Sequence, residues 1–226
     1  MNKQILKVLV GSRAHGLHNE DSDYDFRGVF VLPTSTLLKL GKTRKHTAWI
    51  EDKTDDTSWE IGKFLHLATK CNPTILETFL SPKIYQEDID VKDDKLGNEL
   101  RSLFPYIWNS KGVLDSFIGY GMNQQKKFLA NKDNRADKYA TAYLRTLYNA
   151  YELLSTGELS INMSETPIFD TLKSYKSGEY EVGDVIQTCF DWEKKVIEAY
   201  DSREKKEANL DIINEFLLKV RKEYWK

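Results

Sequence analysis

Acidic side chains and a glycine–serine pair lie close together near the start of the sequence. The segment VLVGSRAHGLHNEDSDYDFRGVFV, residues 8–31, places Gly11 and Ser12 directly after an apolar run, and Asp23 and Asp25 one residue apart. On a strand, residues i and i+2 face the same way, about 6.5–7 Å apart at about 3.3 Å per residue. Two carboxylates this close raise each other's proton affinity unless a positive charge lies between them. A divalent cation such as Mg²⁺, which prefers oxygen ligands, can supply that charge.

The glycine–serine pair has the features of a phosphate-binding turn. Gly11 lets the backbone pass close to a ligand, and Ser12 is expected to cap a short helix whose N–H groups attract phosphate. Two metal ions about 3.5–4 Å apart, bridged by a shared carboxylate, support in-line phosphoryl chemistry. The combined pattern indicates transfer of a nucleotidyl group from a metal-bound nucleoside triphosphate.

Strands in the first third of the chain must position these residues. The apolar run 5–10 predicts a buried strand that ends at Gly11, and residues 11–20 predict a turn and a short helix. Residues 23–32 alternate as a strand with one aromatic face, on which Tyr24 points inward, and an opposite face that carries Asp23, Asp25 and Arg27. Residues 46–50 and 54–59 predict a further strand pair.

Helical periodicity begins after this region and continues to the end of the chain. Ile61, Phe64, Leu65 and Ala68 predict one helix, and Asn72-Pro73-Thr74 separates it from a second at 75–80. Further helices are predicted near 94–107, 112–130, 135–156, 167–176, 182–202 and 207–224, with Gly157 ending the third of these. An acidic, polar stretch at 85–95 predicts a boundary between an N-terminal core, 1–90, and a helical C-terminal domain, 91–226.

Composition narrows the classes of function. Lys and Arg total 33 against 35 Asp and Glu, for a net charge of −2. The global charge therefore argues neither for nor against binding of a nucleic acid. Cys71 and Cys189 have neither disulfide-framework nor zinc-site spacing and are expected to be buried thiols. The sequence has no signal-peptide pattern and no apolar run near the roughly 18 residues that a membrane span needs. We therefore expect a soluble, cytoplasmic protein.

The motifs resemble those of a known enzyme superfamily. An apolar strand, Gly-Ser and then Asp-x-Asp on the next strand are similar to the DNA polymerase β superfamily of nucleotidyltransferases. More narrowly, GSRAHGL, DSDYDFRGVFV, KFLHLATKCNPTILETFL and LRTLYNAYELLSTGEL resemble the nucleotidyltransferases associated with bacterial and phage RNA repair. The resemblance implies an α+β fold with a small mixed sheet and a mostly helical C-terminal part. It also implies two Mg²⁺ ions, with Mn²⁺ as an alternative, held by Asp23 and Asp25, and a triphosphate contacted by Gly11 and Ser12.

A third acid is implied on a neighbouring strand, where it favours deprotonation of the attacking hydroxyl. Within EDKTDDTSWE, residues 51–60, Asp55 aligns with the leading acid of the motif and is the predicted catalytic and metal-binding residue. Asp56 and Glu60 are the alternatives. Among the basic groups, Arg13 and Arg27 are predicted to bind the nucleotide, because a guanidinium forms a planar fork that suits phosphate.

The predicted reaction is Mg²⁺-dependent transfer of a nucleoside monophosphate from a nucleoside triphosphate to an acceptor hydroxyl. By the resemblance, the candidate acceptor is the hydroxyl at an RNA end during RNA repair. A basic stretch is a candidate contact for its backbone, and it comprises Lys126, Lys127, Lys132, Arg135 and Lys138. The alternatives are AMP transfer to a protein or to a small molecule such as an aminoglycoside, and a non-catalytic nucleotide-binding module. A basic acceptor groove would favour RNA, and an acidic one an aminoglycoside.

Overall fold

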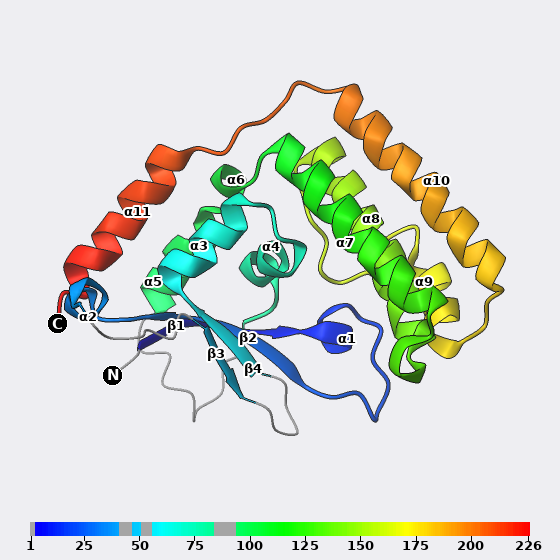
Figure 1. Ribbon diagram of the computed structural model, residues 1–226, viewed down its shortest axis with the longest axis horizontal. Coiled ribbons are helices and arrows are strands. Elements are labelled where there is room, and N and C mark those ends of the chain that lie inside the picture. The colour runs from blue at the N-terminus through cyan, green and yellow to red at the C-terminus, as the bar shows by residue number, and fades with distance from the viewer. Residues whose placement is uncertain (1–2, 41–46, 51–55, 84–93) are drawn as a thin grey trace.

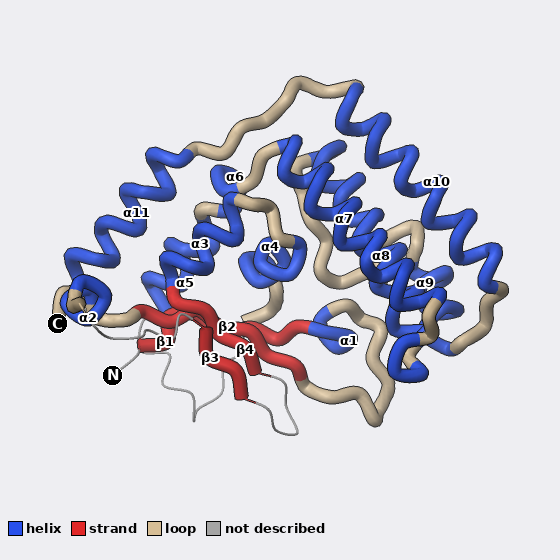
Figure 2. The backbone as a smooth tube through the Cα atoms, viewed as in Figure 1, coloured by secondary structure: helices blue, strands red, loops and turns tan. Residues whose placement is uncertain are grey.

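The computed structural model describes residues 3–40, 47–50, 56–83 and 94–226, which form a small mixed sheet covered by helices (Figures 1 and 2). The strands are β1 (Lys3–Val10), β2 (Asp25–Val31), β3 (Thr47–Ile50) and β4 (Asp56–Glu60), in the spatial order β1-β2-β4-β3. β2 pairs antiparallel with β1 and parallel with β4, and β3 pairs antiparallel with β4. The predicted α+β fold with a small mixed sheet is confirmed.

The strand that carries the acidic motif begins two residues later than predicted. β2 starts at Asp25, so Asp23 and Tyr24 precede the strand. Tyr24 was predicted to point inward, and this is wrong, because its side chain is 50% exposed. The guanidinium of Arg13 lies 3.9 Å from the centre of the Tyr24 ring, and this cation–π contact stabilises the ring at the surface.

Four helices follow the sheet: α3 (Ile61–Thr69), α4 (Pro73–Leu80), α5 (Asp94–Ser102) and α6 (Phe104–Ile107). The predicted apolar stripe of α3 is buried, and α4 begins where the side chain of Asn72 accepts a hydrogen bond from the Ile75 backbone at 3.3 Å. α5 packs closely on β1, because a Cβ on Gly97 would lie 2.3 Å from the carbonyl oxygen of Ile5. A short helix that was not predicted, α2 (Thr34–Leu38), follows β2.

The next helices form a bundle beyond the end of the sheet (Figure 1). They are α7 (Ser110–Leu129), α8 (Ala136–Thr156), α9 (Phe169–Ser177) and α10 (Val182–Asp201), close to the predicted ranges. As predicted, α8 ends at Gly157, which has a φ of 82°. Cys189 of α10 is buried in this bundle, and Cys71 is buried between α3 and α4, where its sulfur contacts Asn109 before α7, so both are the buried thiols that were predicted.

The last helix, α11 (Leu210–Glu223), returns to the N-terminal part of the chain and packs against α3 and α6 (Figure 1). Arg221 of α11 donates hydrogen bonds to both carboxylate oxygens of Glu60, at 2.6 and 2.9 Å. One hydrophobic cluster includes buried residues from β1, α3, α4, α7 and α11. The division at residue 90 stays a prediction. None of the described helices combines the length and apolar character that crossing a membrane requires.

Candidate active site

The turn after β1 depends on glycine for two reasons. β1 ends at Val10, and the four-residue helix α1 (Gly11–Ala14) follows at once. Gly11 has a φ of +71°, and a Cβ on it would lie 2.3 Å from Oδ2 of Asp25. A side chain at this position would therefore be strained and would collide with the carboxylate. The prediction that Ser12 caps the helix is wrong, because α1 begins at Gly11 and no side chain caps it.

The two aspartates of the motif reach the same cleft from different kinds of structure. Antiparallel pairing places Asp25 opposite Val10, so its carboxylate lies against the turn at Gly11. Asp23 lies in the exposed loop before β2. Both side chains line the cleft together with Gly11 and Ser12. The fold thus brings these four predicted residues together, although only Asp25 lies on the strand.

Arg13 holds the loop that carries Asp23. Its Nε and Nη2 donate hydrogen bonds to the carbonyl oxygen of Ser22 at 3.0 and 2.7 Å, and its guanidinium covers Tyr24. Arg13 is not among the residues that line the cleft. The geometry therefore assigns it a contact with the loop, whereas the sequence predicted one with phosphate.

The cleft measures about 680 Å³ and lies between one end of the sheet and helices α7, α8 and α9. Its acidic wall contains Asp21, Asp23 and Asp25. The helices opposite contribute Lys127, Lys138 and Lys176, and two tyrosines, Tyr120 and Tyr139. Of the basic stretch predicted from the sequence, Lys127 and Lys138 line the cleft, and Nζ of Lys127 lies 5.5 Å from the centre of the Tyr139 ring.

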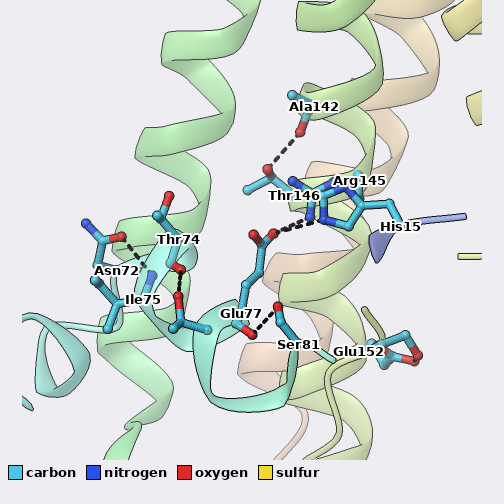
Figure 3. A network of polar contacts seen from close by, with 12 residues as sticks. His15, Asn72, Thr74, Ile75, Glu77, Ser81, Ala142, Arg145, Thr146 and Glu152 are labelled. Carbon is cyan, nitrogen blue, oxygen red and sulfur yellow. Dashed lines mark hydrogen bonds and ion pairs between the residues drawn. The ribbon is translucent and has the colours of Figure 1, made fainter. Parts of the chain in front are cut away.

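A buried carboxylate that lines this cleft holds two arginines. Glu77 of α4 points toward Arg145 of α8 and toward His15 (Figure 3). Nη1 of Arg145 donates to Oε1 of Glu77, and Nη1 of Arg27 donates to Oε2 at 3.3 Å. Nη1 of Arg27 also donates to the Thr74 carbonyl oxygen at 3.2 Å. Three segments, β2, α4 and α8, are thereby linked through one side chain.

The charges of this network are set by burial and by the arginines. Burial alone would raise the pKa of Glu77, but the positive charges, Arg145 foremost, outweigh it and lower the pKa to about 2. Burial, reinforced by the charge of Arg145, lowers the pKa of His15 from 6.5 to about 3. At neutral pH Glu77 is therefore ionised and His15 is neutral. Nε2 of His15 lies 4.0 Å from Oε1 of Glu77.

The predicted third acid, Asp55, lies outside the described residues. Of the two alternatives, Asp56 pairs with Phe26 in the sheet register, on the face away from Asp25, and forms an ion pair with Lys7 at 2.7 Å. Glu60 accepts from the Gly62 backbone at the start of α3 and from Arg221. Both alternatives thus have structural contacts. Within the described ranges, no group of three or more His, Cys, Asp or Glu side chains is arranged to hold a metal ion.

Comparison with known proteins identifies the family. A family model described as "RlaP: RNA repair pathway DNA polymerase beta family" matches residues 2–187, which include the whole cleft. The chain belongs to this family. The predicted resemblance is confirmed, and with it the link to the nucleotidyltransferases of the polymerase β class and to RNA repair.

Proteins similar to this RlaP-family chain occur in a bacterium, a phage and an archaeon. YcgL of Bacillus subtilis is 28% identical over 138 residues, 61% of this chain and 51% of that protein. A 38.9 kDa protein of Enterobacteria phage T4 from the nrdC–mobD intergenic region is 27% identical over 136 residues, 56% of this chain and 39% of its own length. MJ0002 of Methanocaldococcus jannaschii is 27% identical over 175 residues, 75% of this chain and 68% of its own. The chain thus spans about half or less of the first two relatives.

Sequence reasoning missed Arg145 and left Glu77, within the family-like segment KFLHLATKCNPTILETFL, without an assigned role. Both are charged residues within mostly buried helical stretches, YLRTLYNA (residues 143–150) for α8 and PTILETFL for α4. A charge in an apolar stripe is a signal that a partner must exist, because an unpaired buried charge is costly. The partners are 68 positions apart, so the sequence does not reveal their pairing.

Proposed function

We propose that this RlaP-family protein is a Mg²⁺-dependent nucleotidyltransferase that transfers a nucleoside monophosphate from a nucleoside triphosphate to the hydroxyl of an RNA end. The observation that carries this proposal is the packing of the Gly11 turn against the Asp25 carboxylate, in a cleft that Asp23 also lines. The glycine–serine turn and the two carboxylates therefore line the same cleft.

The residues present suit a hard divalent ion. Asp23 and Asp25 offer carboxylate oxygens at one wall of the cleft, and oxygen is the ligand that Mg²⁺ prefers. These two residues would hold the metal, with Asp55 as the third acid. When bound, Mg²⁺ or Mn²⁺ neutralises negative charge on the phosphates and on the attacking oxygen.

The chain's own groups bind and orient the reactants. Gly11 and Ser12 accept the phosphates near the backbone, and Arg27 adds positive charge on the same face of β2. Arg13 contributes by holding the loop that carries Asp23. In the reaction, the acceptor oxygen forms a bond to the α-phosphorus, the bond to the β-phosphate oxygen breaks, and pyrophosphate leaves. The acceptor proton passes to Asp55 or to water. Positioning and charge neutralisation supply most of the rate enhancement.

The charge on the helical side of the cleft supports RNA as the acceptor. Lys127, Lys138 and Lys176 face the space opposite the aspartates. Lysine ammonium groups attract a phosphodiester backbone and repel a polycationic aminoglycoside. An experiment must distinguish nucleotidyl transfer to RNA from two alternatives. In one, the acceptor is a protein hydroxyl, and in the other the protein binds nucleotides without catalysis.

The test is to incubate the protein with each α-³²P-labelled nucleoside triphosphate and Mg²⁺, in the presence of an RNA, a protein or an aminoglycoside pool. We expect label to enter the RNA pool, and EDTA to abolish the transfer. Label in the protein or aminoglycoside pool would show that the acceptor is not RNA, while the reaction would still be nucleotidyl transfer. Label in no pool, with either Mg²⁺ or Mn²⁺, would contradict the enzymatic proposal and favour a binding module.

A further inference from the structure

Two arginines from distant parts of the chain share one buried carboxylate in the lining of the cleft. The Arg27 side chain is 23% exposed, that of Arg145 is 11% exposed, and the Glu77 carboxylate between them is 8% exposed. Both arginines line the cleft. Because each oxygen of Glu77 accepts from one arginine, Glu77 is occupied as an acceptor and serves to hold both guanidinium groups (Figure 3 shows its contact with Arg145).

The guanidinium groups retain donors that a ligand could use. Every hydrogen bond of Arg27 and Arg145 with another described residue runs through Nη1. A guanidinium carries five N–H donors in a fixed plane. Nε and Nη2 therefore form, on each arginine, the edge that binds a phosphate through two parallel hydrogen bonds.

The charge of the cluster also calls for an anion. Two guanidinium groups face a single carboxylate, and His15 adds no charge at neutral pH because burial lowers its pKa. Asp23 and Asp25, which line the same cleft, are the acids assigned above to the metal. A surplus positive charge at a largely buried position is costly until a counter-ion binds. An anionic ligand in the cleft would supply that counter-ion.

We propose that Arg27 and Arg145 form a phosphate-binding subsite of the cleft, separate from the Gly11–Ser12 turn, and that Glu77 is the positioning residue that fixes both arginines. The ligand is a phosphate group, and the proposed function offers two sources, the triphosphate of the nucleotide and the phosphodiester backbone of the RNA acceptor. The subsite would align α8 with the sheet when the ligand binds, since its two arginines come from these two elements.

The experiment measures binding without metal, so that it does not depend on catalysis. Isothermal titration calorimetry in EDTA would use two probes, inorganic tripolyphosphate and a short oligoribonucleotide with a 5′-hydroxyl. The variants are Arg145→Met, Arg145→Lys and Arg27→Met. The matched control is Arg221→Met, which removes the arginine of the Glu60 pair on α11, outside the residues that line the cleft. Circular dichroism melting records whether each variant is folded.

We expect each cleft variant to weaken the binding of at least one probe by about tenfold or more, as loss of a charge-assisted, two-donor contact implies. Arg221→Met should leave the affinities unchanged. Loss for tripolyphosphate assigns the subsite to the nucleotide, and loss for the oligoribonucleotide alone assigns it to the acceptor. In Arg145→Lys the lysine still provides a positive charge beside Glu77, so we expect this variant to fold. It therefore decides the test if Arg145→Met does not fold. Wild-type affinity of folded Arg145→Lys and Arg27→Met for both probes would overturn the proposal.

The variant Glu77→Gln distinguishes two roles of Glu77, positioning the arginines and adding negative charge, because the two roles predict opposite changes in the affinity for phosphate. Removing a negative charge near a phosphate strengthens binding if only the charge matters. If Glu77 positions the arginines, the affinity falls instead, and we expect this fall in the folded variant. Stronger binding would show that Glu77 does not position them. Because neither probe requires turnover, the subsite can stand even if no label is transferred, and it can fail while transfer is observed.

Discussion

At the scale of single residues, Gly11 connects the backbone to the chemistry of the site. Its φ of +71° and the 2.3 Å between its Cβ position and Asp25 Oδ2 are independent constraints, and only glycine satisfies both. The sequence predicted this contact region because Gly-Ser after a strand and Asp-x-Asp are local patterns. It could not predict the Glu77–Arg145 pair, because nothing local links residues on α4 and α8.

Gly11→Ala should damage the site more than the fold. We expect the free energy of unfolding to fall by about 1–2 kcal/mol from the left-handed conformation. Any nucleotidyl transfer should fall further, since the new methyl group displaces Asp25. Urea unfolding and label transfer measure the two effects. The control is Gly119→Ala in α7, where no atom beyond the adjacent residues and the backbone of the helix itself lies within 4 Å of the added methyl group, and alanine favours the helix. Equal activity of the two variants would count against a role for the turn.

At the scale of elements, helical periodicity located the helices well, and proline explains the main difference. Residues 94–107 were predicted as one helix, but α5 ends at Ser102 and α6 begins at Phe104. Pro105 lies in the first turn of α6, where its missing N–H costs nothing, whereas inside a longer helix it would break the hydrogen-bond ladder. The start of β2 was misplaced because alternation continues through Asp23 and Tyr24, although pairing with β1 begins only at Asp25.

The docking of α11 depends on one ion pair that the sequence did not reveal. Arg221→Met leaves the Glu60 carboxylate, whose side chain is 2% exposed, without its charge partner. We expect the free energy of unfolding to fall by about 3 kcal/mol in urea denaturation. Lys219→Met on the same helix removes a half-exposed partner of Glu99 and should cost about 1 kcal/mol or less. Similar losses in the two variants would contradict the assignment of α11 docking to the buried pair.

At the scale of the whole molecule, the cleft lies at the junction between the sheet and the helical bundle, and Glu77 lines it there. The N-terminal segment supplies Asp23, Asp25 and Arg27, and the bundle supplies Arg145 and the lysines. The sequence predicted both halves as elements. Their relative placement depends on side-chain pairs that are distant in sequence, so it became visible only in the folded chain.

Stability should therefore depend on pH through the groups at this junction. Burial and the charge of Arg145 lower the pKa of His15 from 6.5 to about 3. Between these two pH values His15 is therefore protonated in the unfolded chain and neutral in the folded chain. The stabilisation is complete above the unfolded pKa and is lost as the pH falls toward the folded one. Between about pH 6.5 and 4.5, His15 should contribute a fall of about 1 kcal/mol per pH unit in the free energy of unfolding.

Urea denaturation across this pH range tests the contribution. His15→Gln should reduce the slope of stability against pH, and His66→Gln, which replaces an exposed histidine of α3, should not. Below about pH 4.5 a further fall is expected in both variants, because the lowered pKa of Glu77 means that its ionised form stabilises the fold. An unchanged slope in His15→Gln would contradict a neutral, buried His15.

The most direct measurement of the proposed chemistry compares Asp25→Asn with Asp170→Asn. The first replaces a carboxylate at the Gly11 turn by an amide of the same shape, and the second replaces a side chain on α9 that is 92% exposed. With an α-labelled nucleoside triphosphate, RNA and Mg²⁺, we expect Asp25→Asn to lower nucleotidyl transfer by about 100-fold or more while its melting curve stays cooperative. Asp170→Asn should match the wild type. Undiminished transfer by folded Asp25→Asn would show that the chemistry does not take place at this carboxylate.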